Sequence, residues 1–346
     1  MAEPAGTDTV RHAVIAGVNK AGTTSLFVSL GEHPRVVASR VKETRYFLPV
    51  RWGRPLPPFE HYEAQFPPAP PGSVRLEASP SYFYGGAPLA RAIAEHLPGA
   101  RIVVVLREPV ARAVSFFRYQ KTRLRIPADL SFADYLAEAH ALGDRLYTDP
   151  ACEPWFAEAG GRYADHLPGW IEVFGPGAVR ILWFEDLVAD PAGELGRLAE
   201  WLGLDPALLP RRGLAAENRT TGYRVAGLQR LALAFNDRGE RLLRRVPGVK
   251  RALRRLYYRL NGRELAEEIP GAVLAELAAR YEEPNRRLAG FLASWGVPAP
   301  GWLPAADPGS GAGRAGVSAG TPDDVPTAAS TGSLADIPAD IPADMR

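Results

Sequence analysis

The sequence predicts an α/β fold: a P-loop-like parallel sheet flanked by helices on both faces, followed by a helical C-terminal part. Apolar β-branched segments alternate with amphipathic helical patterns as far as about residue 225, which favours parallel strands joined by helices. The segment RIVVVLR at 101–107 shows no polar alternation, as is typical of a strand covered on both faces. A glycine-containing turn, 17–25, directly follows the first apolar run.

The individual elements follow from these patterns in chain order. Strands are predicted at Ala13–Val18, Val74–Ala78, Arg101–Arg107 and Val179–Phe184. Helices are predicted at Thr24–Leu30, Pro88–Leu97, Val110–Lys121, Phe132–Leu142, Tyr163–Phe174, Pro191–Leu202 and Pro270–Trp295.

Three regions are expected along the chain. Residues 1–11 are predicted to form a flexible leader, 12–303 a single domain and 304–346 a disordered tail. The tail contains no aromatic residue and ends in the repeat ADIPADIPADM, a composition that cannot bury enough apolar surface to become ordered. The stretch 238–263 is rich in basic residues and could attract an anionic ligand or a membrane surface, or form a solvated amphipathic helix.

Composition excludes several classes of function. The formal net charge of +2 is too small to indicate nucleic-acid binding, and the single cysteine, Cys152, excludes internal disulfides and cysteine-based metal clusters. The six histidines show no metal-ligand spacing, so we expect no metal site. No run reaches the ~18 apolar residues of a membrane span, and the N-terminus lacks an apolar signal core. We therefore expect a cytoplasmic protein, and the oligomeric state remains open.

The segment GVNKAGTTS at 17–25 is close to a nucleotide-binding loop but departs from it at one position. Gly17 and Gly22 have the spacing of that loop, yet Thr23 stands where its lysine should be, and Lys20 comes two residues before Gly22. A glycine-rich turn between a strand and a helix presents backbone N–H groups to an anion, although such a turn can also be purely structural. The candidate anion ligands are Lys20, Ala21, Gly22, Thr23, Thr24 and Ser25.

A second candidate anion site follows the strand at 101–107. Magnesium-dependent NTPases usually carry an aspartate at the end of a second buried strand, whereas this strand ends in Arg107, which favours phosphate and repels a cation. Ser115 comes eight residues later, in a helix opened by Pro109, and can clamp a phosphate together with Arg107. The alternatives are an ion pair between Arg107 and Glu108 and a serine used only for helix packing.

These motifs together resemble the sulfotransferases that use 3′-phosphoadenosine 5′-phosphosulfate (PAPS), in particular the heparan sulfate sulfotransferase domains and their bacterial relatives. GVNKAGTTSLFVSLGEHP resembles their 5′-phosphosulfate loop, and VVVLREPVARAVSFF resembles their 3′-phosphate motif. RLEASPSYF and YEEPNRRL resemble supporting segments, so the similarity extends over about 13–295. The resemblance implies PAPS as co-substrate and a sulfotransferase fold.

The resemblance also implies roles for single residues. Lys20 would contact the sulfate-bearing phosphate and the bridging oxygen, while Arg107 and Ser115 would bind the 3′-phosphate. Glu43, in KETRYF, falls on the family's catalytic carboxylate and would act as general base. The residues expected on the acceptor side are Lys42, Arg45, Glu77 and Tyr82. From the residues alone, the preferred interpretation of KETRYF is an exposed turn in which Lys42, Glu43 and Arg45 are solvated.

The expected reaction is therefore transfer of a sulfuryl group to a hydroxyl, without a metal. Relatives that act on glycosaminoglycans carry a lysine after the glutamate of the middle motif and a disulfide-bearing loop, whereas this chain has Ala78 after Glu77 and one cysteine. The acceptor is therefore left open between a small molecule and a glycan. Two alternative functions are a P-loop kinase-like phosphotransferase and a nucleotide-binding module without catalysis.

Overall fold

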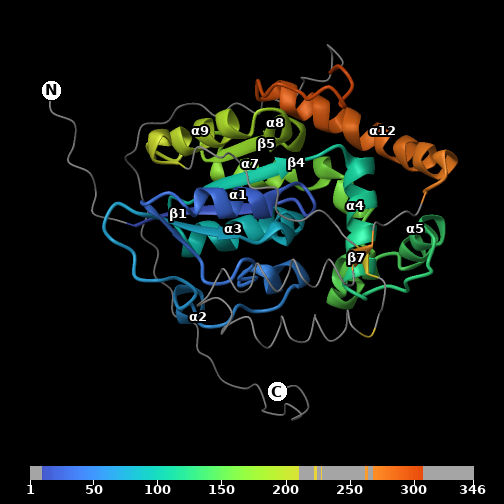
Figure 1. The fold of residues 1–346 in the computed structure, drawn as a ribbon, viewed down its shortest axis with the longest axis horizontal. Coiled ribbons are helices and arrows are strands. Elements are labelled where there is room, and N and C mark those ends of the chain that lie inside the picture. The colour runs from blue at the N-terminus through green and yellow to red at the C-terminus, as the bar shows by residue number, and fades with distance from the viewer. Residues whose placement is uncertain (1–9, 210–221, 224–226, 228–261, 264–267, 307–346) are drawn as a thin grey trace, which may run out of the picture. The chain divides into compact units, whose positions relative to one another are not determined.

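The structure is a computed structural model that describes residues 10–209, 222–223, 227, 262–263 and 268–306 (Figure 1). Most of the predicted leader, nearly all of the basic stretch 238–263, and the tail beyond residue 306 lie outside the described residues. The first strand begins at Arg11, the last residue of the predicted leader.

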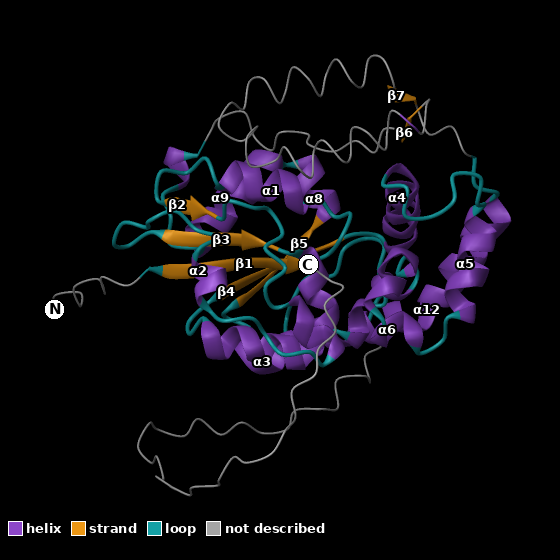
Figure 2. Ribbon diagram, turned by 90° about the horizontal axis from the view of Figure 1, so that it is seen from below, coloured by secondary structure: helices purple, strands orange, loops and turns teal. Residues whose placement is uncertain are grey.

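A five-stranded sheet forms the centre of the described domain, and all of its strands are parallel. Its order is β2-β3-β1-β4-β5, so the strand that precedes the glycine-rich loop lies in the middle (Figure 2). The predicted parallel sheet is confirmed. The strands are β1 (Arg11–Gly17), β2 (Val36–Ala38), β3 (Val74–Ala78), β4 (Arg101–Leu106) and β5 (Val179–Trp183).

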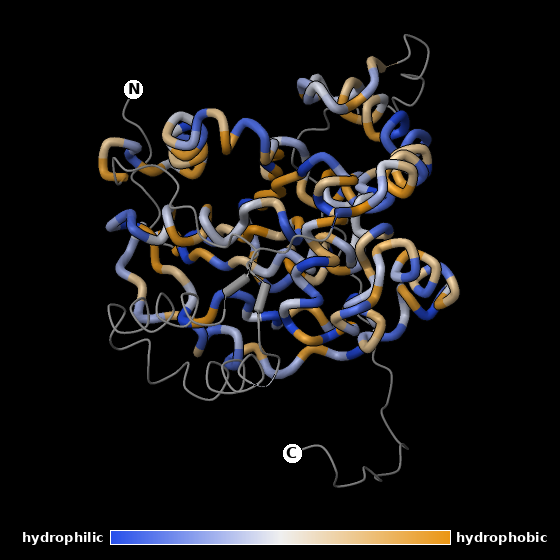
Figure 3. Tube along the Cα trace, turned by 45° about the vertical axis from the view of Figure 1, so that its right-hand side comes forward, coloured by the Kyte–Doolittle hydropathy of each residue, from blue (hydrophilic) through white to orange (hydrophobic). Residues whose placement is uncertain are grey.

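The central strands are buried on both faces, as their unbroken apolar sequences predict. Val14 to Ala16 of β1 and Ile102 to Leu106 of β4 are fully buried. Figure 2 shows α1 (Thr23–Leu30) and α9 (Pro191–Trp201) on one face of the sheet and α3 (Gly86–His96) on the other. Apolar and polar residues alternate along the helices in Figure 3, as expected for helices with one buried side.

The remaining elements extend this core. The long C-terminal helix, α12 (Gly271–Ser294), confirms the helix predicted at 270–295 and buries Leu277, Tyr281, Leu288 and Leu292. The Tyr281 hydroxyl donates to the Glu158 carbonyl at 2.8 Å, which ties α12 to the segment before α7 (Leu167–Phe174). The other helices are α2 (Glu60–Glu63), α4 (Pro109–Thr122), α5 (Phe132–Ala141), α6 (Arg145–Thr148) and α8 (Phe184–Ala189), and β6 (Gly222–Tyr223) pairs with β7 (Gly262–Arg263) in a short antiparallel ladder.

Three local features differ from the sequence-based prediction. The prediction lacks strand β2, which is only three residues long and half-buried at the sheet edge. The helix predicted at 163–174 divides into a 3₁₀ turn, Tyr163–Asp165, and α7, because Pro168 lacks the N–H of a helix interior and occupies the first turn instead. Phe184, predicted to end the last strand, instead begins α8.

Burial predicts how strongly this core depends on single side chains. We expect Val105→Ala in β4 to lower the free energy of unfolding by about 1–3 kcal/mol, because Val105 is fully buried and a cavity replaces its two methyl groups. Urea denaturation provides the measurement. The same substitution at Val188, which is 62% exposed, serves as the matched control and should change stability by less than about 0.5 kcal/mol. Equal effects at the two positions would contradict the burial pattern.

Candidate functional site

The glycine-rich loop connects β1 to α1 at the carboxyl end of the central strand. Gly22 precedes the first turn of α1 with a φ of 79°, and a Cβ placed there would lie 3.2 Å from Cδ2 of Phe184. Glycine is therefore required by both backbone conformation and space. Because Gly22 has no side chain, it cannot cap α1, and the amides of Thr23, Thr24 and Ser25 occupy a helix end that suits an anion.

Lys20 also adopts a left-handed backbone conformation, with a φ of 72°, and its side chain is directed to α4. The Nζ atom lies 4.4 Å from the ring centroid of Tyr119. The pKa of Lys20 is lowered to about 8, first by burial and then by the charges of Arg107 and Lys42, while the charge of Glu43 acts to raise it. Lys20 is thus a cation whose proton is unusually easy to remove.

Arg107 follows β4 directly and lies against the glycine-rich loop. Its Nη1 donates to the backbone carbonyl of Lys20 at 3.0 Å, and its guanidinium stacks 4.4 Å from the ring centroid of Phe184. The same ring contacts the position of Gly22. Phe184, the first residue of α8, therefore supports both predicted anion-binding segments, a role for which no sequence motif provides a signal.

Ser115 is half-buried and lies in the second turn of α4, the helix that begins two residues after Arg107. The beginning of this helix is capped by Glu108, whose carboxylate accepts from the amides of Val110 at 2.9 Å and Ala111 at 2.6 Å. Glu108 thus serves the helix end, which differs from the alternative role of ion-pair partner to Arg107. The guanidinium of Arg107 instead donates its hydrogen bond to the glycine-rich loop, at the carbonyl of Lys20.

The KETRYF segment is held in place by backbone hydrogen bonds. The amide of Glu43 donates to the carbonyl of Ala78 at 2.9 Å, and the amide of Arg45 donates to Oγ of Ser79 at 3.1 Å. Phe47 is fully buried. The segment is therefore anchored to the end of β3, and Lys42, Glu43 and Arg45, which the alternative of an exposed turn would leave solvated, are half-buried.

Glu43 lies at the edge of this anchored segment, with a side chain that is 38% exposed. Its Oε1 is 3.4 Å from Nζ of Lys42, and its charge acts on Lys20. The structure thus brings Glu43, Lys42 and Lys20 into one cluster.

Glu77 and Tyr82 lie underneath the segment and are fully buried. Oε1 of Glu77 accepts hydrogen bonds from the hydroxyls of Thr44 and Ser79, and the Tyr82 hydroxyl accepts from the amide of Phe47 at 3.1 Å. Burial raises the pKa of Glu77, and the hydrogen bonds that it accepts counteract this rise. Both residues contact the loop that carries Glu43, a position that suits support better than direct contact with an acceptor.

A group that the sequence motifs do not reveal lies beside this loop. Glu153 accepts a hydrogen bond from Nη2 of Arg45 at 3.0 Å, and its carboxylate is 3.6 Å from Nη1 of Arg125. Ser81 also donates to Glu153, at 3.2 Å, and accepts from Nδ2 of Asn19 at 3.1 Å. These partners are far apart in the sequence, so no local pattern could have identified them.

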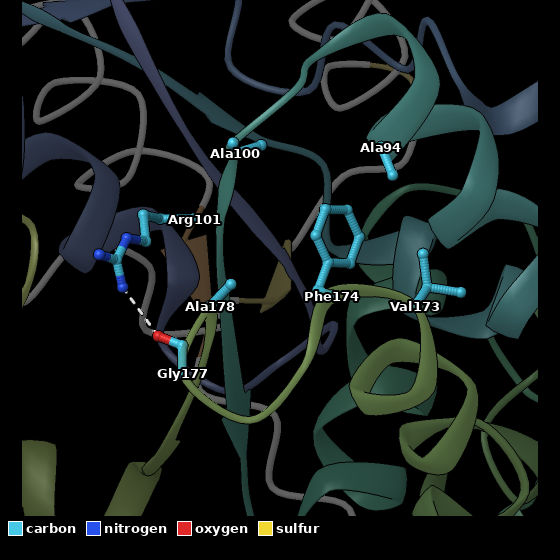
Figure 4. Close-up of a pocket in the computed structure, with 8 residues that line it drawn as sticks. Ala94, Ala100, Arg101, Val173, Phe174, Gly177 and Ala178 are labelled. Carbon is cyan, nitrogen blue, oxygen red and sulfur yellow. Dashed lines mark hydrogen bonds between the residues drawn. The ribbon is translucent and has the colours of Figure 1, made fainter. Parts of the chain in front are cut away.

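An open concavity of about 560 Å³ lies elsewhere, lined by Ala94, Gly99, Ala100, Arg101, Val173, Phe174, Gly177 and Ala178 (Figure 4). Arg101 begins β4, whereas Arg107 follows its end. This concavity therefore lies at the amino end of β4, and the glycine-rich loop contacts Arg107 at the carboxyl end. Its arginine is already engaged: Nη1 donates to the Gly177 carbonyl at 2.7 Å. The remaining lining residues are alanine, glycine, valine and phenylalanine, which supply no side-chain acid or base for group transfer.

Two further findings concern the part of the chain that the structure describes. Within it, no three histidine, cysteine, aspartate or glutamate side chains are grouped so that they could hold a metal ion. Among the same residues, no helix combines the length and the apolar character needed to cross a membrane.

Comparison with known proteins identifies the family. Residues 10–211 match the model of the sulfotransferase domain. Over 265 residues, the chain is 31% identical to heparan sulfate glucosamine 3-O-sulfotransferase 6 of Homo sapiens, covering 73% of this chain and 72% of that protein. The chain belongs to the sulfotransferase family. It is also 29% identical over 275 residues to heparan sulfate glucosamine 3-O-sulfotransferase 3B1 of Mus musculus, covering 75% of this chain and 65% of that protein.

A solved structure supports the fold assignment of this sulfotransferase. The sulfotransferase from Alicyclobacillus acidocaldarius superposes with a TM-score of 0.51 at 23% identity, covering 69% of this chain and 96% of that one. The fold and family predicted from the phosphate-binding motifs are confirmed. The protein is an enzyme that transfers sulfuryl groups, with PAPS as the donor that the family uses.

The low pKa of Lys20 predicts a pH-dependent affinity for the desulfated donor, adenosine 3′,5′-bisphosphate. In the free protein Lys20 loses its proton as the pH rises through about 8, and an anion then binds only if that proton is regained. We expect affinity, measured by calorimetry, to fall by up to about tenfold per pH unit between pH 8 and 10. Lys20→Arg, which stays protonated, should remove this dependence; an equally steep fall in that variant would assign it to another group.

Proposed function

We propose that the protein transfers the sulfuryl group of PAPS to a hydroxyl of a small molecule or glycan, with Glu43 as general base and no metal. The observation that carries this proposal is the convergence of three charged groups at the carboxyl ends of neighbouring strands. Lys20 follows β1, Arg107 follows β4, and the backbone of Glu43 is bonded to the end of β3. Ligands of open parallel α/β sheets bind outside the carboxyl ends of the strands.

The residues present fit the two charged ends of the donor. The open end of α1 and the side chain of Lys20 would bind the 5′-phosphosulfate, since both favour an anion. Arg107, with Ser115 farther along the chain, would bind the 3′-phosphate bidentately through its guanidinium. The ring of Phe184 fixes the plane of that guanidinium.

In the proposed reaction, Lys20 stabilises the charge on the leaving group and Glu43 accepts the proton of the acceptor hydroxyl. The sulfur–oxygen bond to the donor's 5′-phosphate breaks while a bond to the acceptor oxygen forms, by analogy with in-line phosphoryl transfer. Negative charge then develops on the departing phosphate oxygen, where Nζ of Lys20 would stabilise it. The acceptor hydroxyl would give its proton to the carboxylate of Glu43, whose neighbours Lys20 and Lys42 keep that carboxylate close to the transferred group.

The acceptor side is the region of Lys42 and Arg45, which flank Glu43. Glu77 and Tyr82, also expected on this side, would act from below by holding the KETRYF segment. The relatives from Homo sapiens and Mus musculus are named for the O-sulfation of glucosamine in heparan sulfate, which supports a sugar hydroxyl as one acceptor class.

The donor assignment predicts a ligand preference that is independent of the acceptor. We expect adenosine 3′,5′-bisphosphate to raise the melting temperature in the presence of EDTA, because Arg107 and Lys20 bind phosphate without a metal. ATP with magnesium should produce little change. An equal or larger shift with magnesium-ATP would contradict the proposed donor site and favour a phosphotransferase.

The assignment of the base predicts a selective loss of turnover. Glu43→Gln preserves size but removes the proton acceptor, so kcat should fall by about 100- to 10,000-fold while the Kd for adenosine 3′,5′-bisphosphate stays unchanged. Product formation from PAPS and calorimetry would measure the two quantities.

The matched control is Glu77→Gln, at the buried carboxylate that accepts a hydrogen bond from Thr44 of the segment. The introduced amide would retain an oxygen that can accept from Thr44 and Ser79, so kcat of this variant should fall by less than about 100-fold. If Glu77→Gln abolished transfer and Glu43→Gln did not, the base would be misassigned, whereas the donor site would stand.

A further inference from the structure

Glu153 lies between two arginines that come from different parts of the chain. Its Oε2 is 3.0 Å from Nη2 of Arg45, in the KETRYF segment, and 3.6 Å from Nη1 of Arg125, just beyond α4. The side chain of Glu153 is only 14% exposed, whereas each arginine side chain is 39% exposed. A single, mostly buried carboxylate thus holds two guanidiniums that both reach solvent.

The position of this group relative to the proposed reaction is fixed by two connections. Arg45 is two residues from Glu43 in a segment whose backbone is bonded to the end of β3. On the other side, Ser81 links Oε1 of Glu153 to Asn19, the residue before Lys20. Glu153 is therefore linked by hydrogen bonds both to the segment that carries the proposed base and to the loop that carries the proposed leaving-group cation.

Tyr119 provides an independent connection. Its ring lies under Nζ of Lys20. Burial raises the pKa of its hydroxyl, and the charges that act on it include those of Glu43, Arg125 and Glu153. Lys20 thus contacts Tyr119, and the charges of Glu153 and of the proposed base act on the same side chain.

From this geometry we propose that Glu153 determines acceptor specificity by occupying the anion-binding faces of Arg45 and Arg125. A sulfate or carboxylate on an acceptor would compete with a carboxylate that is already hydrogen-bonded there and would be repelled by its charge. The site therefore selects acceptors that are uncharged at the group beside the reacting hydroxyl. This inference rests on the proposed function, because it requires Glu43 and Lys20 to mark the reaction centre.

The charge balance around Glu153 explains why its removal should have a large effect. Two guanidiniums face one carboxylate, and Arg51, stacked 4.3 Å from the ring centroid of Phe156, adds positive charge nearby. Without the carboxylate, both guanidiniums would lose their partner while remaining partly desolvated. An added anion would then regain hydrogen bonds at both guanidiniums.

The test is Glu153→Gln in the full chain saturated with adenosine 3′,5′-bisphosphate. Two probes of equal length are used: a sulfated heparin tetrasaccharide and the uncharged, fully N-acetylated tetramer of glucosamine, called chitotetraose below. We expect Glu153→Gln to bind the sulfated probe at least about tenfold more tightly than the wild type does, which corresponds to about 1.4 kcal/mol. The affinity for chitotetraose should remain within about twofold. An unchanged affinity for the sulfated probe would overturn the proposal.

Glu194→Gln is the matched control. Glu194 on α9 is also 14% exposed and also pairs with an arginine, at 2.7 Å from Nη2 of Arg197, so its substitution removes the same charge elsewhere. It should leave both affinities unchanged. An equal gain for the sulfated probe in Glu194→Gln would show a general charge effect and would also overturn the proposal.

A second variant, Arg125→Gln, keeps Glu153 in place and tests the proposal even if Glu153→Gln does not fold. Because Glu153 already occupies Arg125, this variant should bind the sulfated probe within about twofold of the wild type. A clear loss of affinity would mean that Glu153 yields to an incoming anion, which would overturn the proposal.

The donor ligand separates a failure of this proposal from a failure of the proposed function. If the wild-type protein does not bind adenosine 3′,5′-bisphosphate at all, the proposed function fails. If that ligand binds but Glu153→Gln does not gain affinity for the sulfated probe, only the role of Glu153 fails.

Discussion

The hydrogen bond from Arg107 to the backbone carbonyl of Lys20 joins the two segments on which the site depends. It requires the loop after β1 to approach the end of β4, and the adjacent pairing of these two central strands makes that approach possible. Phe184 completes the arrangement, because its ring contacts the guanidinium on one side and leaves room only for glycine at position 22 on the other. Donor binding is therefore a property of the sheet order as much as of the motifs.

The candidate residues of this half could be named from the sequence because they lie in short motifs, although the contact between Arg107 and Lys20 spans 87 residues. The four long strands, the helices after them and the anion-binding residues all follow from short patterns, and the buried β4 segment is the clearest of them. The exact ends of the helices could not be predicted. Pro168, for example, has no backbone N–H and lies in the first turn of α7, so the helix begins later than predicted. The three-residue β2 has too few positions to show any period.

The acceptor half could not be predicted in the same way. Glu153 is separated by 108 residues from Arg45 and by 72 from Ser81, so its role exists only after the chain has folded. Glu77 illustrates the same limit: its type and place in a motif were visible, but its burial beneath Thr44 and Ser79 was not. The proposed acceptor residues thus come together only through contacts between distant segments, whereas the candidate donor residues can be recognised within short motifs.

The helices α1 and α4, whose first turns lie at the proposed donor site, differ in how these turns are capped. The two ends of the site therefore differ chemically. The start of α1 follows a glycine and offers unshielded amides, whereas the start of α4 is closed by the carboxylate of Glu108. An elongated ligand with a phosphate at each end would therefore meet backbone dipoles at one end and side chains at the other. Such asymmetry disfavours the reversed orientation, so that a single binding pose would present the transferable group to the acceptor.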